Sequence, residues 1–372
     1  MRRRFIGTTF ALTATLALAA TGTAAAAPSK DGAVYTLSNS AAGNVVLAYS
    51  RAGDGTLSPI ASYPTGGLGS GGGLGSQGAV TLSDNGRLLL AVDAGSDTIT
   101  SFRVAKDGAL TLADHVASGG VHPISVTIND RLVYVLNDGG AGNVAGFTVD
   151  RDGDLSSIAG SARPLTGAGV GPAQVSFTPD GRSLVVTEKA ANKIVTYQVA
   201  KDGTASGPTG FSSAGATPFG FAFDQHGRLL VSEAFGGAPG ASVVSSYDIS
   251  KSGVITVVDP LVATTETAAC WVAVTPNGKF AYTTNTGSGT VSGFAISPHG
   301  DLGLLNADGV TGVTGAGSSP IDAATSAQGG YLYVLDAGTD AISAFAIGND
   351  GALTSVTGLT GLPPSGLGLA AY

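Results

Sequence analysis

The amino-acid sequence predicts an all-β fold built from seven copies of one four-stranded unit, and three observations support this prediction. Lines such as GPAQVSFTPDGRSLVVTE, which begins at Gly171, recur along the chain. The turn residue of each copy follows the previous one after 44 to 54 residues, a period typical of propeller blades rather than helical solenoids. The composition, with 58 glycines and 43% hydrophobic residues among 372, fits many tight turns around a sizeable core. We therefore expect a seven-bladed β-propeller.

Each copy alternates apolar and polar residues between Gly, Asn and Asp turns, which is the pattern of half-buried strands. In the copy that begins at Gly171, AQVSFT predicts a first strand, PDGR a tight turn and SLVVTE a second strand. KIVTYQVA then predicts a third strand, and a KDG turn joins it to a weaker fourth strand. The turn residues that mark the seven copies are Gly32, Gly86, Asp130, Gly181, Gly227, Gly278 and Gly330.

The two ends of the chain predict how the ring closes. AVYTLSN, which begins at Ala33, matches a second strand, so the chain begins inside a blade. PSGLGLAAY at the end of the chain matches a first strand. We expect this C-terminal strand to complete the N-terminal blade and so leave no open sheet edge at the seam. Residues 27–372 then form a single domain.

Residues 1–26 have the layout of a secretory signal peptide, with three arginines ahead of an apolar run that ends in small residues. Cleavage is expected near Ala26. RRRFI also resembles part of a twin-arginine export signal, so the export route stays open between the two. Loss of the three arginines takes the formal net charge from −8 to −11. The expected location is secreted or periplasmic.

The charge, the cysteine count and the length of the apolar runs argue against nucleic-acid binding, a disulfide-stabilised fold and a membrane span. An acidic surface disfavours nucleic acid as a partner. Cys270 is the single cysteine, so no intramolecular disulfide can form. After the signal segment no apolar run is long enough to span a membrane. We expect a monomer whose partner is a small molecule or a carbohydrate.

Strand direction places polar side chains on one face of the ring. The start of each first strand and the end of each second strand share one face, here the top face, and the PDGR and KDG turns lie on the bottom face. The glycine-rich stretch PTGGLGSGGGLGSQG is expected to be a flexible connector on the top face. Of the four histidines, His122 alone is expected there, either as an exposed loop residue or as a base.

The last residue of the second strand is a carboxylate or an amide in every copy. At the Asn and Asp positions, capping of the following turn is the simpler interpretation. Glu is a poor turn former, so Glu188 and Glu233 are the better candidates for function. Asp93 and Asp336 could still contact a ligand, or gather with both glutamates around a hard cation such as calcium. No cofactor is otherwise predicted. The seven positions are Asn39, Asp93, Asn137, Glu188, Glu233, Asn285 and Asp336.

A second set of positions, near the start of each first strand, should line the channel. Small residues there leave room for a ligand, which Gln174, Trp271 and Asp322 could contact. Packing between blades is the alternative for Trp271, because an indole serves equally well as a ring platform or as core. The seven positions are Ala79, Ser125, Gln174, Gly220, Trp271, Asp322 and Gly366.

These lines, together with the seven-fold count, resemble the lactonase family of seven-bladed propellers over nearly the whole chain after residue 32. The resemblance implies a lactone hydrolase. It places Glu188 at the position of the family's glutamate, as a general base or a water-positioning group. Two positions depart from the family pattern, because Ala173 and Gln174 replace an Arg-His pair and Gly78-Ala79 replaces a histidine.

Two functions of different classes therefore stay open. The first is an exported lactonase-like hydrolase, with Glu188 and Gln174 as catalytic residues. Asp93, Glu233, Trp271, Asp322 and Asp336 would shape its pocket on the top face. The second is a non-catalytic propeller outside the cytoplasm that binds a small molecule, a glycan or a protein.

Overall fold

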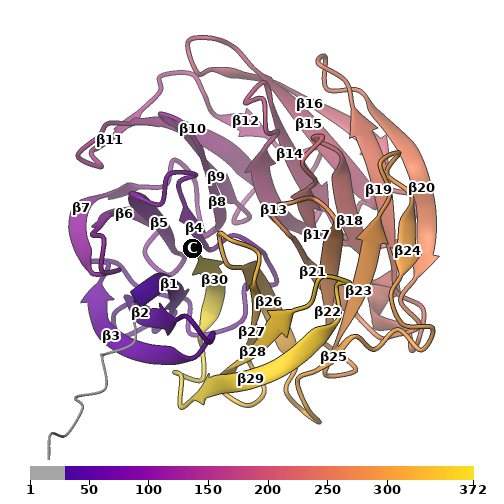
Figure 1. The fold of residues 1–372 in the computed structure, drawn as a ribbon. Helices are drawn as coiled ribbons and strands as arrows, with labels where there is room; N and C mark the ends of the chain where they lie inside the picture. The colour runs from indigo at the N-terminus through magenta and orange to yellow at the C-terminus, as the bar shows by residue number, and fades with distance from the viewer. Residues whose placement is uncertain (1–29) are drawn as a thin grey trace, which may run out of the picture.

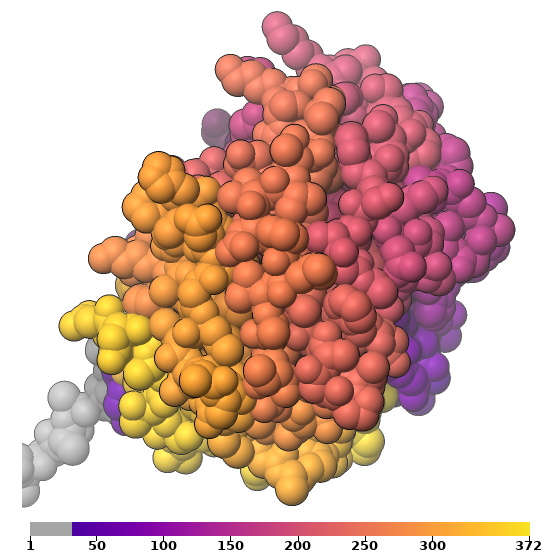
Figure 2. Space-filling model, turned by 90° about the vertical axis from the view of Figure 1, so that its right-hand side faces the viewer, coloured from indigo at the N-terminus to yellow at the C-terminus, as the bar shows by residue number. Residues whose placement is uncertain are grey.

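The computed structural model describes residues 30–372, which form a ring of seven antiparallel sheets (Figure 1). The predicted all-β, seven-bladed propeller is therefore confirmed. The signal peptide predicted at residues 1–26 lies outside the described residues. In the view of Figure 2 the colours follow one another in bands around the molecule, because neighbouring blades are consecutive in the sequence.

Apart from β30, the strands of the first three blades lie in the first half of the chain. The strands of blade 1 are β1 (Lys30–Leu37), β2 (Val45–Ala52), β3 (Leu57–Pro64) and β30 (Leu367–Ala371). Those of blade 2 are β4 (Val80–Leu82), β5 (Leu88–Asp93), β6 (Thr98–Val104) and β7 (Leu110–Ala117). Those of blade 3 are β8 (Pro123–Asn129), β9 (Leu132–Asn137), β10 (Asn143–Val149), β11 (Leu155–Ser157) and β12 (Arg163–Pro164).

Four further blades complete the ring. The strands of blade 4 are β13 (Pro172–Phe177), β14 (Ser183–Glu188), β15 (Lys193–Val199) and β16 (Ala205–Ser212). Those of blade 5 are β17 (Pro218–Phe223), β18 (Leu229–Glu233), β19 (Val243–Ile249) and β20 (Ile255–Ala263). The short 3-10 helix η1 (Phe235–Gly237) follows β18. Those of blade 6 are β21 (Ala269–Val274), β22 (Phe280–Asn285), β23 (Thr290–Ile296), β24 (Leu302–Leu304) and β25 (Gly312–Val313). Those of blade 7 are β26 (Pro320–Thr325), β27 (Tyr331–Asp336), β28 (Ala341–Ile347) and β29 (Leu353–Thr360).

The ring closes as predicted, with the C-terminal strand inside the N-terminal blade. β30 pairs antiparallel with β1, with Val34 opposite Ala371 and Thr36 opposite Leu369. β30 is the innermost strand of blade 1, and its pairing covers the edge of β1.

Two of the marker residues differ in detail from the prediction. In blade 7 the residue equivalent to the turn glycines is Gly329, whose N–H donates to Ser326 O as Gly181 N–H does to Thr178 O. Gly330 follows it. Gly32 lies within β1, at an irregularity in the pairing with β2. The period itself is unaffected.

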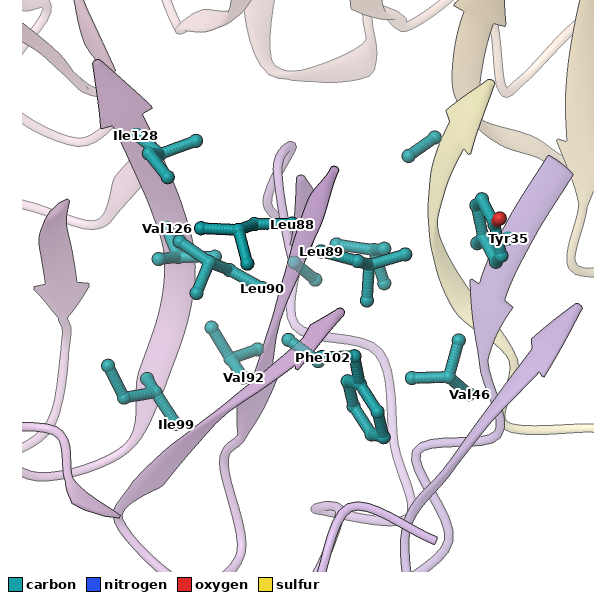
Figure 3. Packing of buried hydrophobic residues seen from close by; sticks show 14 of the residues in the cluster. Tyr35, Val46, Leu88, Leu89, Leu90, Val92, Ile99, Phe102, Val126 and Ile128 are labelled. Atoms are coloured by element: carbon teal, nitrogen blue, oxygen red, sulfur yellow. The ribbon is translucent and has the colours of Figure 1, made fainter. Parts of the chain in front are cut away.

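The hydrophobic core lies between blades as well as within them. The second strands β5 and β14 are buried at every residue, because neighbouring blades cover both of their faces. In Figure 3 side chains from three consecutive blades meet: Tyr35 and Val46 from blade 1, Leu89 and Phe102 from blade 2, and Val126 from blade 3. The outermost strands are mostly exposed, as in β3. This packing fixes the first strands around a central channel.

Within residues 30–372 no helix is long and apolar enough to cross a membrane.

Candidate functional site

Glu233, a predicted ligand-binding residue at the end of β18, is fully buried and bound on both oxygens. Its Oε1 accepts hydrogen bonds from the hydroxyls of Ser213 and Tyr247, both at 2.6 Å. Its Oε2 accepts one from Ser245 at 2.6 Å. Ser213 follows β16 of the preceding blade, so the carboxylate ties two blades together. It has no side-chain surface toward the channel.

Glu188, the predicted catalytic base, makes the same kind of contact. It is fully buried at the end of β14, where Oε1 accepts the Thr166 N–H at 2.9 Å and Oε2 accepts the Thr166 hydroxyl. Thr166 follows β12 of blade 3. The carboxylate thus fixes the segment that arrives from the preceding blade, and no described contact turns it toward a substrate.

Asp93 completes this pattern in blade 2. Its Oδ1 accepts bonds from the Thr65 hydroxyl and from Asn44 Nδ2 at 2.9 Å, and its Oδ2 accepts one from the Thr100 hydroxyl at 2.8 Å. Burial raises the pKa of this carboxyl. Thr65 again belongs to the segment after the preceding blade. A hydroxyl residue about 20 to 28 positions ahead of the carboxylate, seen in the pairs Thr65 and Asp93 or Ser213 and Glu233, is the sequence signal for this contact.

Asp336 in blade 7 departs from the pattern. Ser343 donates to its Oδ2 at 2.5 Å, but its Oδ1 is buried without a hydrogen-bond partner. The hydroxyl of Thr314, which follows the preceding blade, lies 2.6 Å from the Ser318 hydroxyl. Phe345 stands at the register position that Tyr247 holds in blade 5, so the second hydroxyl is missing as well. Burial raises the pKa of Asp336 to about 7.

The glycine-rich connector between β3 and β4 covers the top of the channel and is held there by side chains. Gln77 reaches from blade 2 to blade 6, where its Nε2 donates to Val272 O at 2.9 Å and its Oε1 accepts the Val272 N–H at 3.2 Å. Its own N–H donates to Ala173 O of blade 4 at 3.0 Å. Gly220 makes room for this crossing, since a Cβ there would lie 2.3 Å from Gln77 Oε1. The connector was expected to be flexible, and it is a plug with fixed contacts.

Trp271 of blade 6 and Lys189 of blade 4 hold the same connector. The Trp271 indole N–H donates to Ser76 O at 2.9 Å, and its ring lies 4.9 Å from that of Phe219. Lys189 Nζ donates to Gly75 O and lies 4.4 Å from the centre of the Phe219 ring. Burial lowers the pKa of Lys189. Trp271 is 5% exposed, so it acts as the roof of the channel rather than as an open platform.

Below this plug lies a central cavity of about 290 Å³. Its wall is formed by inner-strand residues of five strands and by Gln77 at its upper end. The predicted residues Gln174 and Asp322 both line it, so the structure brings these two together. Gln174 has both amide atoms bound to the backbone of Phe221, at 3.0 and 2.7 Å. Its amide is therefore occupied in fixing β13 to β17.

Asp322 is the one ionisable side chain among the described residues that line the cavity. A bulge between Pro320 and Asp322, where β26 pairs with β27, directs this side chain. Oδ1 accepts the Ala323 N–H at 2.8 Å, and Oδ2 accepts the Leu369 N–H at 3.0 Å. Burial raises the pKa of this carboxyl to about 8. It can therefore gain or lose a proton near neutral pH.

His122 on the top face has a partner that the sequence did not reveal. Its Nδ1 lies 2.6 Å from Asp138 Oδ1, and both side chains are partly exposed. His122 has a positive φ of 56°, and its N–H donates to Asp97 Oδ1 at 2.7 Å. Asp138 directly follows β9. The pair forms a histidine–carboxylate dyad, although no cavity residue belongs to it.

Within the part of the chain that the structure describes, no three His, Cys, Asp or Glu side chains lie close enough to hold a metal ion. Asp93, Glu188 and Glu233 each bind hydroxyl donors of their own surroundings.

Comparison with known proteins now adds to the geometry. The family described as Lactonase, 7-bladed beta-propeller, matches residues 26–163, 143–235 and 233–366. The chain belongs to this lactonase family. A curated 6-phosphogluconolactonase of Bacillus subtilis (strain 168) is 26% identical over 251 residues, which cover 62% of this chain and 70% of that protein. A second, from Yersinia pseudotuberculosis serotype O:3 (strain YPIII), is 26% identical over 161 residues, 41% of this chain and 48% of that protein.

Solved structures show the same fold. The periplasmic gluconolactonase of Pseudomonas aeruginosa has a TM-score of 0.70 at 18% identity, covering 89% of this chain and 98% of that chain. A protein of Desulfotomaculum acetoxidans DSM 771 has a TM-score of 0.70 at 14% identity, covering 91% and 98%. At these identities the likeness between this chain and the two solved structures concerns the fold alone.

Proposed function

We propose that this lactonase-family protein hydrolyses a lactone in the central cavity, with Asp322 as the base for the attacking water. The observation that supports this best is that Asp322 is the single ionisable side chain among the described cavity residues. A cavity of about 290 Å³ has room for a small lactone ring and a water, whose share of liquid volume is about 30 Å³. The names of the curated relatives point to the same reaction class.

The chemistry requires only a base and a water. In its ionised form Asp322 takes a proton from water while the water oxygen attacks the lactone carbonyl carbon. The bond between the carbonyl carbon and the ring oxygen then breaks, and the proton passes to the departing oxygen. One lactone and one water thus give one hydroxy acid. The N–H groups of Ala323 and Leu369 hold the carboxylate in place and favour its charge.

Substitution of three candidate bases tests the location of the site. We expect Asp322→Asn to lower kcat for a neutral sugar lactone by about 10²–10⁴, the usual contribution of a general base. His122→Gln and Glu188→Gln are matched controls on the top face and should retain kcat within about twofold, because neither side chain lines the cavity. Circular dichroism of each variant verifies the fold. A loss of activity in His122→Gln or Glu188→Gln alone would move the reaction to the top face.

The pH dependence gives an independent measurement. A base must be unprotonated, and the pKa of Asp322 is about 8, so kcat should rise about tenfold per pH unit up to that value and then level off. The spontaneous rate, measured with Asp322→Asn, is subtracted at each pH. A profile that is flat between pH 6 and 8 would contradict Asp322 as the base.

A binding protein without activity is the second function that we propose, favoured by the side chains at positions 173 and 174. Ala173 and Gln174 stand where the family pattern has Arg-His, and the Gln174 amide is bound to backbone. If no lactone is hydrolysed above the spontaneous rate, the cavity serves to bind a small molecule, glycan or protein segment.

We also propose that the protein works outside the cytoplasm, as a secreted or periplasmic protein. The support is the run of Arg2, Arg3 and Arg4 ahead of an apolar stretch that ends in small residues. N-terminal sequencing of the protein recovered from culture medium or periplasm tests this, and a start near Ala27 is the expected result.

A further inference from the structure

A hollow of about 510 Å³ on the bottom face is lined by four basic side chains. From this geometry we infer that the hollow binds a small, multiply charged anion of the phosphate type. The inference goes beyond the proposed lactone hydrolysis and does not depend on it. The four side chains are Arg87 in the turn between β4 and β5, Arg103 on β6, Lys106 in the turn between β6 and β7, and Arg151 in the turn between β10 and β11.

Strand pairing brings these cations together. Val104 N–H donates to Arg87 O at 2.8 Å, which places the end of β6 beside the turn that carries Arg87. The turn with Arg151 belongs to blade 3 but is docked on blade 2, because the Ser101 hydroxyl donates to Gly153 O at 2.6 Å. These contacts therefore fix the segments that carry the cations next to one another.

Acidic residues occur in the same turns but do not line the hollow. Asp107 and Asp150 each use Oδ1 to accept N–H groups of their own turns. Asp152 lies 3.7 Å from Arg103, and both side chains are more than half exposed, so the pair contributes little. Asp84 is exposed in the turn ahead of Arg87. No Asp or Glu is found among the described residues that form the wall of the hollow.

The remaining wall fits a compact anion. Guanidinium groups present paired N–H donors that match phosphate oxygens, and three of the four cations are arginines. Asn85 adds an amide, and Tyr372, stacked at 6.4 Å on Tyr35, closes one side. The chain as a whole carries a net charge of −8, which repels a long polyanion that would extend beyond the hollow. A small phosphate-type anion both matches the guanidinium donors and stays within the hollow.

Blades 4 and 5 repeat most of these positions and provide a matched control. Arg182 and Lys201 correspond to Arg87 and Lys106, and Lys251 corresponds to Arg151. The position of Arg103 is filled by the neutral Gln198. Arg182 also lies 3.6 Å from Asp180, and Asp180 lines the neighbouring hollow. The inference therefore predicts binding at blades 2 and 3 and not at blades 4 and 5.

Titration calorimetry of the full chain with inorganic pyrophosphate at low ionic strength tests the site. We expect one site per chain and about tenfold weaker binding in Arg87→Gln/Arg151→Gln. The control Arg182→Gln/Lys251→Gln should bind as the unchanged protein does. At about 1 M sodium chloride, where the Debye length is about 3 Å, binding should weaken strongly.

Either of two results would overturn the inference: no heat of binding to pyrophosphate at low salt, or equal weakening in the two double variants. All four substituted residues are exposed, and an unchanged melting temperature without pyrophosphate verifies that each variant folds. Since the measurement needs no lactone, it stands whether or not the protein is a hydrolase.

Discussion

The top of the central channel and the hollow on the bottom face are built from opposite kinds of contact. At the top, Gln77 and Trp271 bind backbone groups of the opposite side of the ring, so the chain itself occupies the place where a ligand would sit. At the bottom, Arg87 and Lys106 present their charges to a hollow. The difference shows that polar side chains at strand ends do not by themselves make a binding site. Their hydrogen bonds within the protein decide whether they can contact a ligand. Chemistry is better sought where an ionisable side chain lines a cavity, as Asp322 does.

The largest effect is expected from a deletion that removes part of the cavity wall and, with Tyr372, part of the wall of the bottom hollow. Deletion of residues 367–372 takes away β30, which pairs with β1 and whose Leu369–Ala371 segment lines the cavity. The exposed edge of β1 should pair with other chains, so we expect aggregated protein in size-exclusion chromatography. A soluble monomer with an unchanged melting temperature would contradict the closure by β30.

A smaller effect is expected from a substitution in the connector, which should loosen the connector and leave the seven blades folded. Gln77→Ala removes two hydrogen bonds and leaves the buried N–H and C=O of Val272 unpaired, at a cost of about 1–3 kcal/mol in the free energy of unfolding. Urea unfolding measures that cost. The freed connector should also become sensitive to limited proteolysis.

Gln174→Ala is the matched control, since it removes the same pair of contacts, to Phe221, from a first strand instead of from the connector. We expect similar destabilisation without new cleavage in the connector. Equal cleavage in the two variants would show that Gln77 is not what holds the plug.

The smallest effect concerns the incomplete contact at Asp336. Its folded pKa, about 7, lies above the value of about 3.9 in an unfolded chain, so its contribution to stability is full below pH 4 and is lost as pH rises to about 7. Asp336→Asn removes this buried charge and should therefore raise the free energy of unfolding at pH 8. At pH 4 the two proteins should differ little in urea unfolding. A variant that is less stable at pH 8 would mean that an unseen partner satisfies the carboxylate.

Local patterns were enough to predict the fold. The repeated PDGR-like turns and the alternation in lines such as AQVSFT depend on neighbouring residues, which is why strands and turns could be read from them. The closure by PSGLGLAAY was equally accessible, because it needed only the match between the last strand and a first strand. Even the shift of the blade 7 marker, from Gly330 to Gly329, is a difference of a single residue within a turn.

The sequence by itself determined the ring, its seven blades and the assignment of residues to its two faces. Only the tertiary structure decided which of these residues are hydrogen-bonded to other parts of the protein. The reason is that a hydrogen bond depends on the distance between two groups in space and not on their separation in the sequence. Glu188 binds Thr166 of the preceding blade, and Gln77 binds Val272, 195 positions away. The raised pKa of Asp322 is likewise a consequence of burial that several strands produce together. A pattern within one strand contains none of this information.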